Sequence, residues 1–230
     1  MKPMQKRARR AFTLVELLVV IAILSVLAAV IYPVYSAARQ RAYVATCLAN
    51  LSQIGKATAI YAADWDSHLP LALDCEHYAP NGHSINPTDN EALDGLVKQL
   101  PSIKTLLKSY GVVDAQWHCP ADHIDAVLQA EGGHAPTFYQ DMGSSYEYDD
   151  KDALEGQTLS SFAAPASQPL FWEYEPFHNQ THLPPGPDPS ARTGVLYADS
   201  HVKCVLWDEL LKQQKNPIVT GSGSSESGGR

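Results

Sequence analysis

The chain has 230 residues, with 17 Lys and Arg against 25 Asp and Glu, and a formal net charge of −8 at pH 7. The charge is divided: the first ten residues carry five basic side chains and no acid, whereas residues 64–230 carry nine basic and 24 acidic side chains. Phosphate contacts require basic side chains, so no nucleic-acid contact is expected from this acidic part.

A short basic leader, residues 1–11, precedes an uncharged apolar run. Leu17 to Ala38 contains no charged side chain, and as a helix these 22 residues would span roughly 33 Å, enough to cross a bilayer. The leader is basic and contains no acid, so it is expected to stay in the cytoplasm. Glu16 is the single acid at the start of the run, and a carboxylate beside a membrane helix is costly, so its position requires a reason.

The stretch Ala11-Phe-Thr-Leu-Val-Glu16 resembles the processing site of the type IV prepilin class, in which Gly or Ala precedes Phe-Thr-Leu-(Ile/Val)-Glu. The resemblance implies cleavage between Ala11 and Phe12 by a prepilin peptidase, followed by N-methylation of Phe12. Cleavage there would leave a free α-amino group close to Glu16. Pro33 would be position 22 of the processed chain, where pilin-like proteins commonly carry a proline that kinks the helix.

Two other interpretations of the N terminus remain open. A secretory signal peptide also has a basic start and an apolar middle, and Ser36-Ala37-Ala38 would serve as its cleavage site. The apolar run is longer than the usual 7–15 residues, roughly, of such a peptide, and Glu16 lies at its very start. A plain membrane anchor is the second alternative, but it leaves Phe-Thr-Leu-Val-Glu unexplained.

The helical pattern continues beyond Pro33. Apolar side chains recur mostly at three- and four-residue steps, as an amphipathic stripe of Val44, Cys47, Leu48, Leu51, Ile54, Ala57 and Tyr61. We therefore expect one helix from Phe12 to about Ala63, with residues 12–38 as the transmembrane and assembly part and residues 39–63 as its amphipathic outer half. A spine helix with a globular head packed on its outer half is the arrangement that the resemblance to pilins and pseudopilins implies.

Residues 64–219 are expected to form an α+β head, in which a small antiparallel sheet packs against the outer half of the helix. Leu93 to Tyr110 has helical spacing, with Pro101 starting or bending a turn. Five segments have strand character: Trp117–Cys119, Ser144–Tyr148, Pro169–Tyr174, Gly194–Ala198 and His201–Leu206. The last two are predicted to form a hairpin around Asp199-Ser200. Leu183 to Pro189 is expected to be an extended loop, and residues 220–230 a flexible Gly/Ser-rich tail.

A second resemblance concerns the head. Cys47-Leu-Ala-Asn-Leu, Trp117-His-Cys-Pro and Gly194-Val-Leu-Tyr-Ala-Asp-Ser-His201 are similar to a subgroup of pilin-like proteins with an H-x9-DG type C-terminal motif. The motif is degenerate here. Its Asp-Gly is Asp199-Ser200, and the position ten residues before Asp199 is Pro189 rather than a histidine.

Four cysteines, Cys47, Cys75, Cys119 and Cys204, would lie on the far side of the membrane, where disulfides persist. Four cysteines allow three pairings, and the sequence does not choose among them. One or two disulfides are expected, although Cys47 on the apolar face of a helix could also be a buried free thiol.

The head offers candidate metal ligands, but no metal site is expected. His118, Cys119, Asp122 and His123, or Asp199 with His201, have spacings that match no zinc pattern. The oxygens of Asp64, Asp66, Asp149, Asp150 and Asp152 could bind calcium, as in related major pseudopilins, although no EF-hand spacing supports this. No other cofactor is expected.

The chain is not expected to be an enzyme, because it has no GxSxG, P-loop or GxGxxG motif. The most aromatic stretch, Phe171 to Phe177, is interpreted as core packing, with a surface for a sugar or a partner as its alternative.

The sequence therefore predicts a structural subunit of a type IV pilus or type II secretion filament. Its expected partners are the prepilin peptidase, other copies of itself and other pilin-like subunits. It is expected in the bacterial cytoplasmic membrane, as a single-pass protein with an extracytoplasmic head, and in a filament after assembly. The alternative function is a membrane-anchored or secreted extracytoplasmic binding domain.

Overall fold

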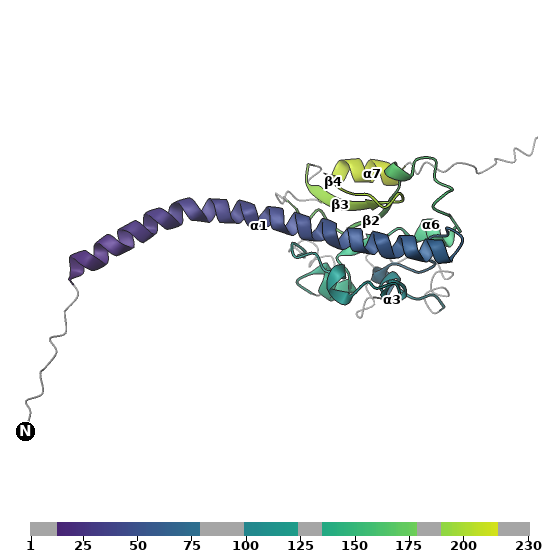
Figure 1. The fold of residues 1–230 in the computed structure, drawn as a ribbon, viewed down its shortest axis with the longest axis horizontal. Helices are drawn as coiled ribbons and strands as arrows, with labels where there is room; N and C mark the ends of the chain where they lie inside the picture. Colours follow the sequence, from purple (N-terminus) through teal and green to yellow (C-terminus); the bar gives the residue numbers. More distant parts are fainter. Residues whose placement is uncertain (1–12, 79–98, 124–134, 179–189, 216–230) are drawn as a thin grey trace, which may run out of the picture. The chain divides into compact units, whose positions relative to one another are not determined.

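The computed structural model describes residues 13–78, 99–123, 135–178 and 190–215. The chain divides into two compact units, Met1–Arg41 and Ala42–Arg230. Helix α1, Leu14–Asp64, has its first part in unit one and its second part in unit two. The predicted long helix is therefore present, and each unit is described by itself below (Figure 1).

The part of α1 in unit one exposes its apolar side chains on all sides. From Leu14 to Tyr35 the large hydrophobic side chains are 47–78% exposed. The helix is long and apolar enough to cross a membrane by length and composition. It continues through Pro33, which cannot donate a helical hydrogen bond.

The part of α1 in unit two buries a single stripe of side chains and so confirms the amphipathic pattern. Its buried residues are Cys47, Leu51, Ile54, Gly55, Ala57, Thr58, Tyr61 and Ala62. The helix ends where Asp66 and Ser67 adopt positive φ, and the backbone N–H of Ser67 donates to the carbonyl of Ala62. A left-handed residue just beyond the last turn is a common way for a helix to end.

Unit two contains a four-stranded antiparallel sheet in the order β1-β2-β3-β4. The strands are β1 (Tyr146–Tyr148), β2 (Pro169–Glu173), β3 (Arg192–Tyr197) and β4 (Val202–Leu206). Four of the five predicted strands are confirmed with small shifts of their ends. The hairpin between β3 and β4 is also confirmed. The α+β class follows from this sheet and α1.

The two faces of the sheet pack against different helices (Figure 1). Leu196 and Phe171 belong to the core that includes the α1 stripe, while Val195 and Trp172 belong to a second core with Leu210 of α7. This follows from the two-residue alternation of side chains along a strand. Helix α7 (Trp207–Lys215) follows β4 directly and was not predicted from the sequence.

Glycine allows α1 to approach β3 closely. A Cβ atom built on Gly55 of the helix would lie 2.7 Å from Leu196 Cδ1, and one on Gly194 of β3 would lie 3.0 Å from Leu51 Cδ1. Real Cβ atoms essentially never come within 3.0 Å of another heavy atom. The helix therefore rests on the sheet through two positions where a side chain would separate them.

Short helices and turns complete unit two, and one expectation needs correction. The strand expected at Trp117–Cys119 is wrong: Asp114–Trp117 is a 3-10 helix, and the buried Trp117 ring packs against Phe171 from outside the sheet. The interpretation of Phe171 to Phe177 as core packing is confirmed, since Phe171, Trp172, Tyr174 and Phe177 are all buried.

The predicted helix at Leu93–Tyr110 is shorter in its described part. Helix α3, Ile103–Lys108, begins after Ser102, whose hydroxyl accepts from the backbone N–H of Thr105. The remaining short elements are η1 (Cys75–Tyr78), α5 (Phe138–Met142), α6 (Asp150–Leu154) and η3 (Pro165–Ser167). The predictions for residues 93–98, Leu183–Pro189 and 220–230 lie outside the described residues.

Candidate functional site

The described chain begins with a polar arrangement at the start of α1. Oε2 of Glu16 accepts hydrogen bonds from the backbone N–H of Thr13 at 2.9 Å and from the Thr13 hydroxyl at 2.7 Å. In return, Thr13 Oγ1 accepts from the backbone N–H of Glu16 at 3.2 Å. This reciprocal pair is a capping box, with Thr13 at the N-cap and Glu16 at the third helical position.

This role of Glu16 was not among the predictions from the sequence, although its signal is present: a Thr stands three residues before a Glu at the start of an apolar run. Glu16 satisfies N-terminal donors of its own helix and leaves its negative charge at the positive end of the helix dipole. The predicted cleavage site at Ala11 and Phe12 lies outside the described residues.

The apolar surface that follows Glu16 is continuous through Pro33 and Tyr35. Ser25 is one of its few polar residues, and its hydroxyl donates to the carbonyl of Ile21 at 2.7 Å. A hydroxyl bonded to its own helix backbone costs little in an apolar surrounding. The described part of this segment is therefore suited to contact with lipid or with apolar helices.

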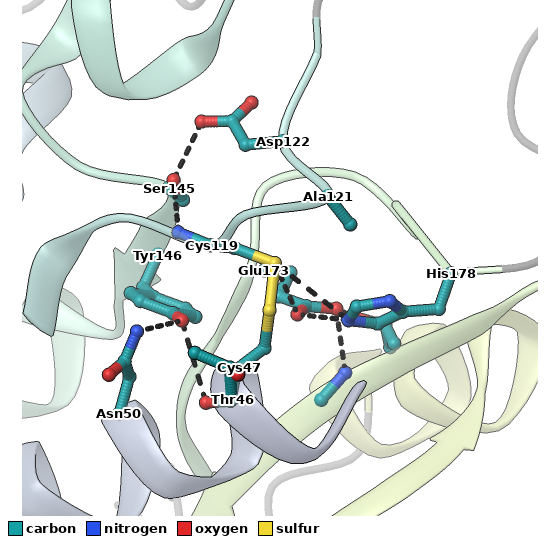
Figure 2. A network of polar contacts seen from close by, with 12 residues as sticks. Thr46, Cys47, Asn50, Cys119, Ala121, Asp122, Ser145, Tyr146, Glu173 and His178 are labelled. Carbon is teal, nitrogen blue, oxygen red and sulfur yellow. Dashed lines mark hydrogen bonds and ion pairs between the residues drawn. A yellow bond between two sulfur atoms is a disulfide. The ribbon is translucent and has the colours of Figure 1, made fainter. Parts of the chain in front are cut away.

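Unit two contains a buried cluster formed by a disulfide, a glutamate and a histidine. Cys47 of α1 forms a disulfide with Cys119, which follows the 3-10 helix Asp114–Trp117 (Figure 2). Their Cα atoms are 5.1 Å apart and both side chains are fully buried. The structure thus pairs two of the four cysteines. Cys75 and Cys204 are free thiols, the first buried and the second half-buried.

Glu173 and His178 lie beside the disulfide, as Figure 2 shows. Glu173 ends β2 and is fully buried, and its Oε1 lies 2.9 Å from His178 Nε2. Its Oε2 accepts from the backbone N–H of Gly194 at 2.9 Å and from the Thr193 hydroxyl at 3.3 Å. Since a buried charge is tolerated only when it is paired and hydrogen-bonded, these contacts explain how Glu173 can be buried.

Neighbouring polar residues attach Cys119 to the rest of the head. The Ser145 hydroxyl accepts from the backbone N–H of Cys119 at 3.0 Å and donates to Asp122 at 2.6 Å. Asp122 also accepts from the backbone N–H groups of Phe138 and Tyr139. Burial raises the pKa of Asp122, and these hydrogen bonds oppose the shift. Asp122 therefore organises loops rather than offering a free carboxylate.

The other predicted metal candidates have structural partners. The His118 ring packs at a tilt against the Tyr139 ring, and Nδ1 of His123 lies 2.9 Å from the carbonyl of Ala121. Asp199 accepts from the backbone N–H of His201 at the tip of the β3–β4 hairpin.

The acids considered for calcium are divided between two places. Asp64 and Asp66 lie at the C-terminal end of α1, while Asp149 and Asp150 lie at the start of α6. Asp150 Oδ2 accepts from the backbone N–H of Asp74 at 2.8 Å and lies 3.2 Å from His77 Nε2. Over the described residues, the one group of three or more His, Cys, Asp or Glu side chains that could hold a metal is Cys47, Cys119, Glu173 and His178.

Asp74, whose backbone N–H donates to Asp150, is itself a buried acid. Asp74 accepts from the backbone N–H groups of Tyr148 and Glu76 and from the Tyr174 hydroxyl. Burial raises the pKa of Asp74 to about 7, against the opposing effect of these hydrogen bonds. Burial also raises the pKa of Asp149 to about 7, with the nearby Asp152 adding to the shift. The head therefore contains carboxyl groups that ionise near neutral pH.

Comparisons with known proteins match the N-terminal segment. The family model described as the prokaryotic N-terminal methylation motif matches residues 6–32. This range includes the predicted cleavage site, the capping box and most of the apolar run. No curated protein and no solved structure matches the chain. The chain carries this motif. The motif is consistent with type IV pilin-like proteins and pseudopilins, which are structural rather than enzymatic. It is also consistent with membrane anchoring.

Proposed function

We propose that the chain is a structural subunit of a type IV pilus or type II secretion filament. It is made as a precursor, cut between Ala11 and Phe12 by a prepilin peptidase, and assembled with copies of itself and other pilin-like subunits through α1. The observation that carries the proposal lies within the matched residues 6–32, where a single carboxylate, Glu16, stands at the start of an exposed apolar helix.

The physical argument concerns the environment of Glu16. When apolar helices pack side by side, a carboxylate among them is tolerated only if it is paired. The capping box supplies neutral donors from Thr13, and the processed α-amino group of Phe12, from the same or a neighbouring subunit, supplies the positive charge. A charge pair of this kind fixes the axial position of one subunit against the next, so Glu16 specifies assembly.

Two substitutions separate the charge of Glu16 from its capping role. Glu16→Gln keeps an oxygen that accepts from the Thr13 backbone N–H but removes the charge. Thr13→Ala removes the capping hydroxyl and keeps the charge. We expect Glu16→Gln and Glu16→Ala to insert into the membrane normally and to abolish or misregister filaments in electron micrographs. Thr13→Ala is expected to assemble, because its cost is about 1 kcal/mol of helix stability.

N-terminal sequencing of the membrane-bound wild-type protein tests the processing step. A methylated Phe12 at the N terminus supports the proposal. A start near Arg39 would indicate a signal peptide, and an uncut Met1 a plain anchor. Normal filaments from Glu16→Gln would contradict the role given to the charge.

A further inference from the structure

We propose that Cys47, Cys119, Glu173 and His178 form a zinc site when the Cys47–Cys119 disulfide is reduced. The disulfide and the zinc ion would be alternative cross-links at one place in the head. The inference does not depend on filament assembly, since it concerns only residues of unit two.

The chemical identities of the four side chains fit zinc. Two thiolates, one imidazole nitrogen and one carboxylate oxygen are all ligand types that zinc accepts in four-coordinate sites. One ligand atom from each side chain lies within 4.8 Å of all the others. They come from three distant parts of the chain, since only Glu173 and His178 are close in sequence, and their spacing matches no short zinc motif.

The distances among three of the ligand atoms approach those of a tetrahedral site. With zinc bonds of about 2.3 Å to sulfur and about 2.1 Å to nitrogen and oxygen, tetrahedral geometry separates sulfur from either lighter ligand by about 3.6 Å. Cys119 Sγ lies 3.6 Å from Glu173 Oε1 and 3.8 Å from His178 Nε2. Oε1 and Nε2 are 2.9 Å apart, against about 3.4 Å in such a site. Glu173 and His178 therefore need only small shifts.

The surroundings fix the positions of both non-sulfur ligands. Glu173 is held through Oε2 by Gly194 and Thr193, which leaves Oε1 directed at the sulfur atoms (Figure 2). His178 is 3% exposed, and among the described residues its Nδ1 has no hydrogen-bond partner. The ring is therefore held by burial and by Glu173 through Nε2. A zinc ion would take the place of the proton between Nε2 and Oε1.

Conversion between the two states balances as a thiol–disulfide exchange. A disulfide oxidant accepts two electrons from the zinc-bound thiolates of Cys47 and Cys119 and, with two protons, becomes two thiols. The two sulfur atoms bond to each other and the zinc ion is released. A thiol reductant drives the reverse step, and zinc binding then stabilises the reduced head by mass action.

Cobalt(II) gives a direct test, because it replaces zinc and absorbs visibly when bound by thiolates in a tetrahedral site. The full chain in detergent is reduced in urea, freed of reductant under nitrogen, and refolded with cobalt. We expect one cobalt per reduced chain, with a sulfur-to-cobalt charge-transfer band that zinc abolishes. The oxidised chain is expected to bind none. No such band from the refolded reduced chain would overturn the proposal.

Substitutions identify the ligands. Glu173→Gln and His178→Gln are each expected to weaken cobalt binding about 100-fold, because the affinity of such a site is shared among its ligands. The matched control is the double variant Cys75→Ser/Cys204→Ser, which removes both free thiols and should leave the spectrum unchanged. Loss of the band in this control, or full affinity in both single variants, would assign the metal elsewhere.

Circular dichroism and the fluorescence of the buried Trp117 verify that each variant is folded. If Glu173→Gln does not fold, Glu173→Asp replaces it, since it keeps the carboxylate but withdraws it by one methylene. Weaker cobalt binding by a folded Glu173→Asp supports the site, and unchanged binding contradicts it.

Discussion

The two parts of α1 are built from similar apolar residues but face different surroundings. In unit one, Leu24 is 58% exposed and Val26 67% exposed, whereas Leu51 and Ile54 in unit two are fully buried. Only the second part carries polar residues on one side, because only there does a protein core cover the other side. An amphipathic stripe therefore indicates that a helix packs through a single face, whereas an apolar helix without such a stripe indicates an apolar surrounding on every side.

A matched pair of substitutions tests this difference most strongly. Leu51→Ala removes a fully buried side chain, and we expect it to lower the free energy of unfolding of the head by about 2–5 kcal/mol. Leu24→Ala makes the same change in the exposed part and should leave that free energy unaltered. Urea unfolding of the detergent-solubilised chain, followed by tryptophan fluorescence, measures both. Equal losses of unfolding free energy from the two substitutions would contradict the difference in burial between the two parts of α1.

The close approach of α1 to the sheet gives a smaller effect. Gly55→Ala places a methyl group 2.7 Å from Leu196 Cδ1 and 3.2 Å from its Cδ2, and Leu196 is itself fully buried. We expect a loss of about 1–3 kcal/mol, even though alanine favours the helix by about 1 kcal/mol. Gln53→Ala, on the exposed side of the same turn, is the control. Stabilisation by Gly55→Ala would mean that the helix can move away from the sheet without cost.

Among the described residues, the buried carboxyl groups all lie in the head, so the stability of the head is expected to depend on pH. Burial raises the pKa of Asp74 and of Asp149 to about 7, above their usual values near 4. Between about pH 4 and pH 7 the folded head therefore binds more protons than the unfolded chain. The free energy of unfolding should fall as pH rises through this window, by at most about 1.4 kcal/mol per pH unit for each group.

Urea titrations at several pH values measure this dependence. Glu147 adds to it in the same direction, because burial also raises its pKa. Asp74→Asn is expected to flatten the curve by removing one of these groups. A head that becomes more stable between pH 5 and pH 7 would contradict the prediction.

The smallest effect is expected at the hairpin tip. Ser200 has a φ of 70°, in the left-handed region that favours glycine. Ser200→Gly is expected to stabilise the head by about 0.5 kcal/mol, because the relief of strain exceeds the extra entropy of glycine in the unfolded chain. Ser109→Gly, at a right-handed helix end with a φ of −68°, should not stabilise it. Thermal unfolding measures both changes.

Local patterns predicted the long helix, four strands and the β3–β4 hairpin, since each depends on short-range periodicity or turn chemistry. They failed at Trp117, whose aromatic character resembles a strand but whose ring fills the core from a 3-10 helix. Helix α7 was missed because its nine residues have few apolar positions and pack only through a small second core.

The sites show the same division between local and long-range information. The processing motif and the capping box lie within a few residues of one another and can be found in the sequence. The cluster of Cys47, Cys119, Glu173 and His178 cannot, because it forms only when α1, the segment after a 3-10 helix and the end of β2 come together. The pairing of Cys47 with Cys119 was likewise not predictable, because four cysteines allow three pairings and the sequence does not choose among them.

The disulfide also makes a closed covalent ring of the chain between Cys47 and Cys119, which are 72 positions apart. A single backbone cut anywhere inside that ring leaves both resulting pieces in one molecule, so α1 stays covalently linked to the sheet after proteolysis. Such a nicked protein would migrate as one species without reductant and as two with it. One cut inside the ring would therefore not separate the sheet from α1.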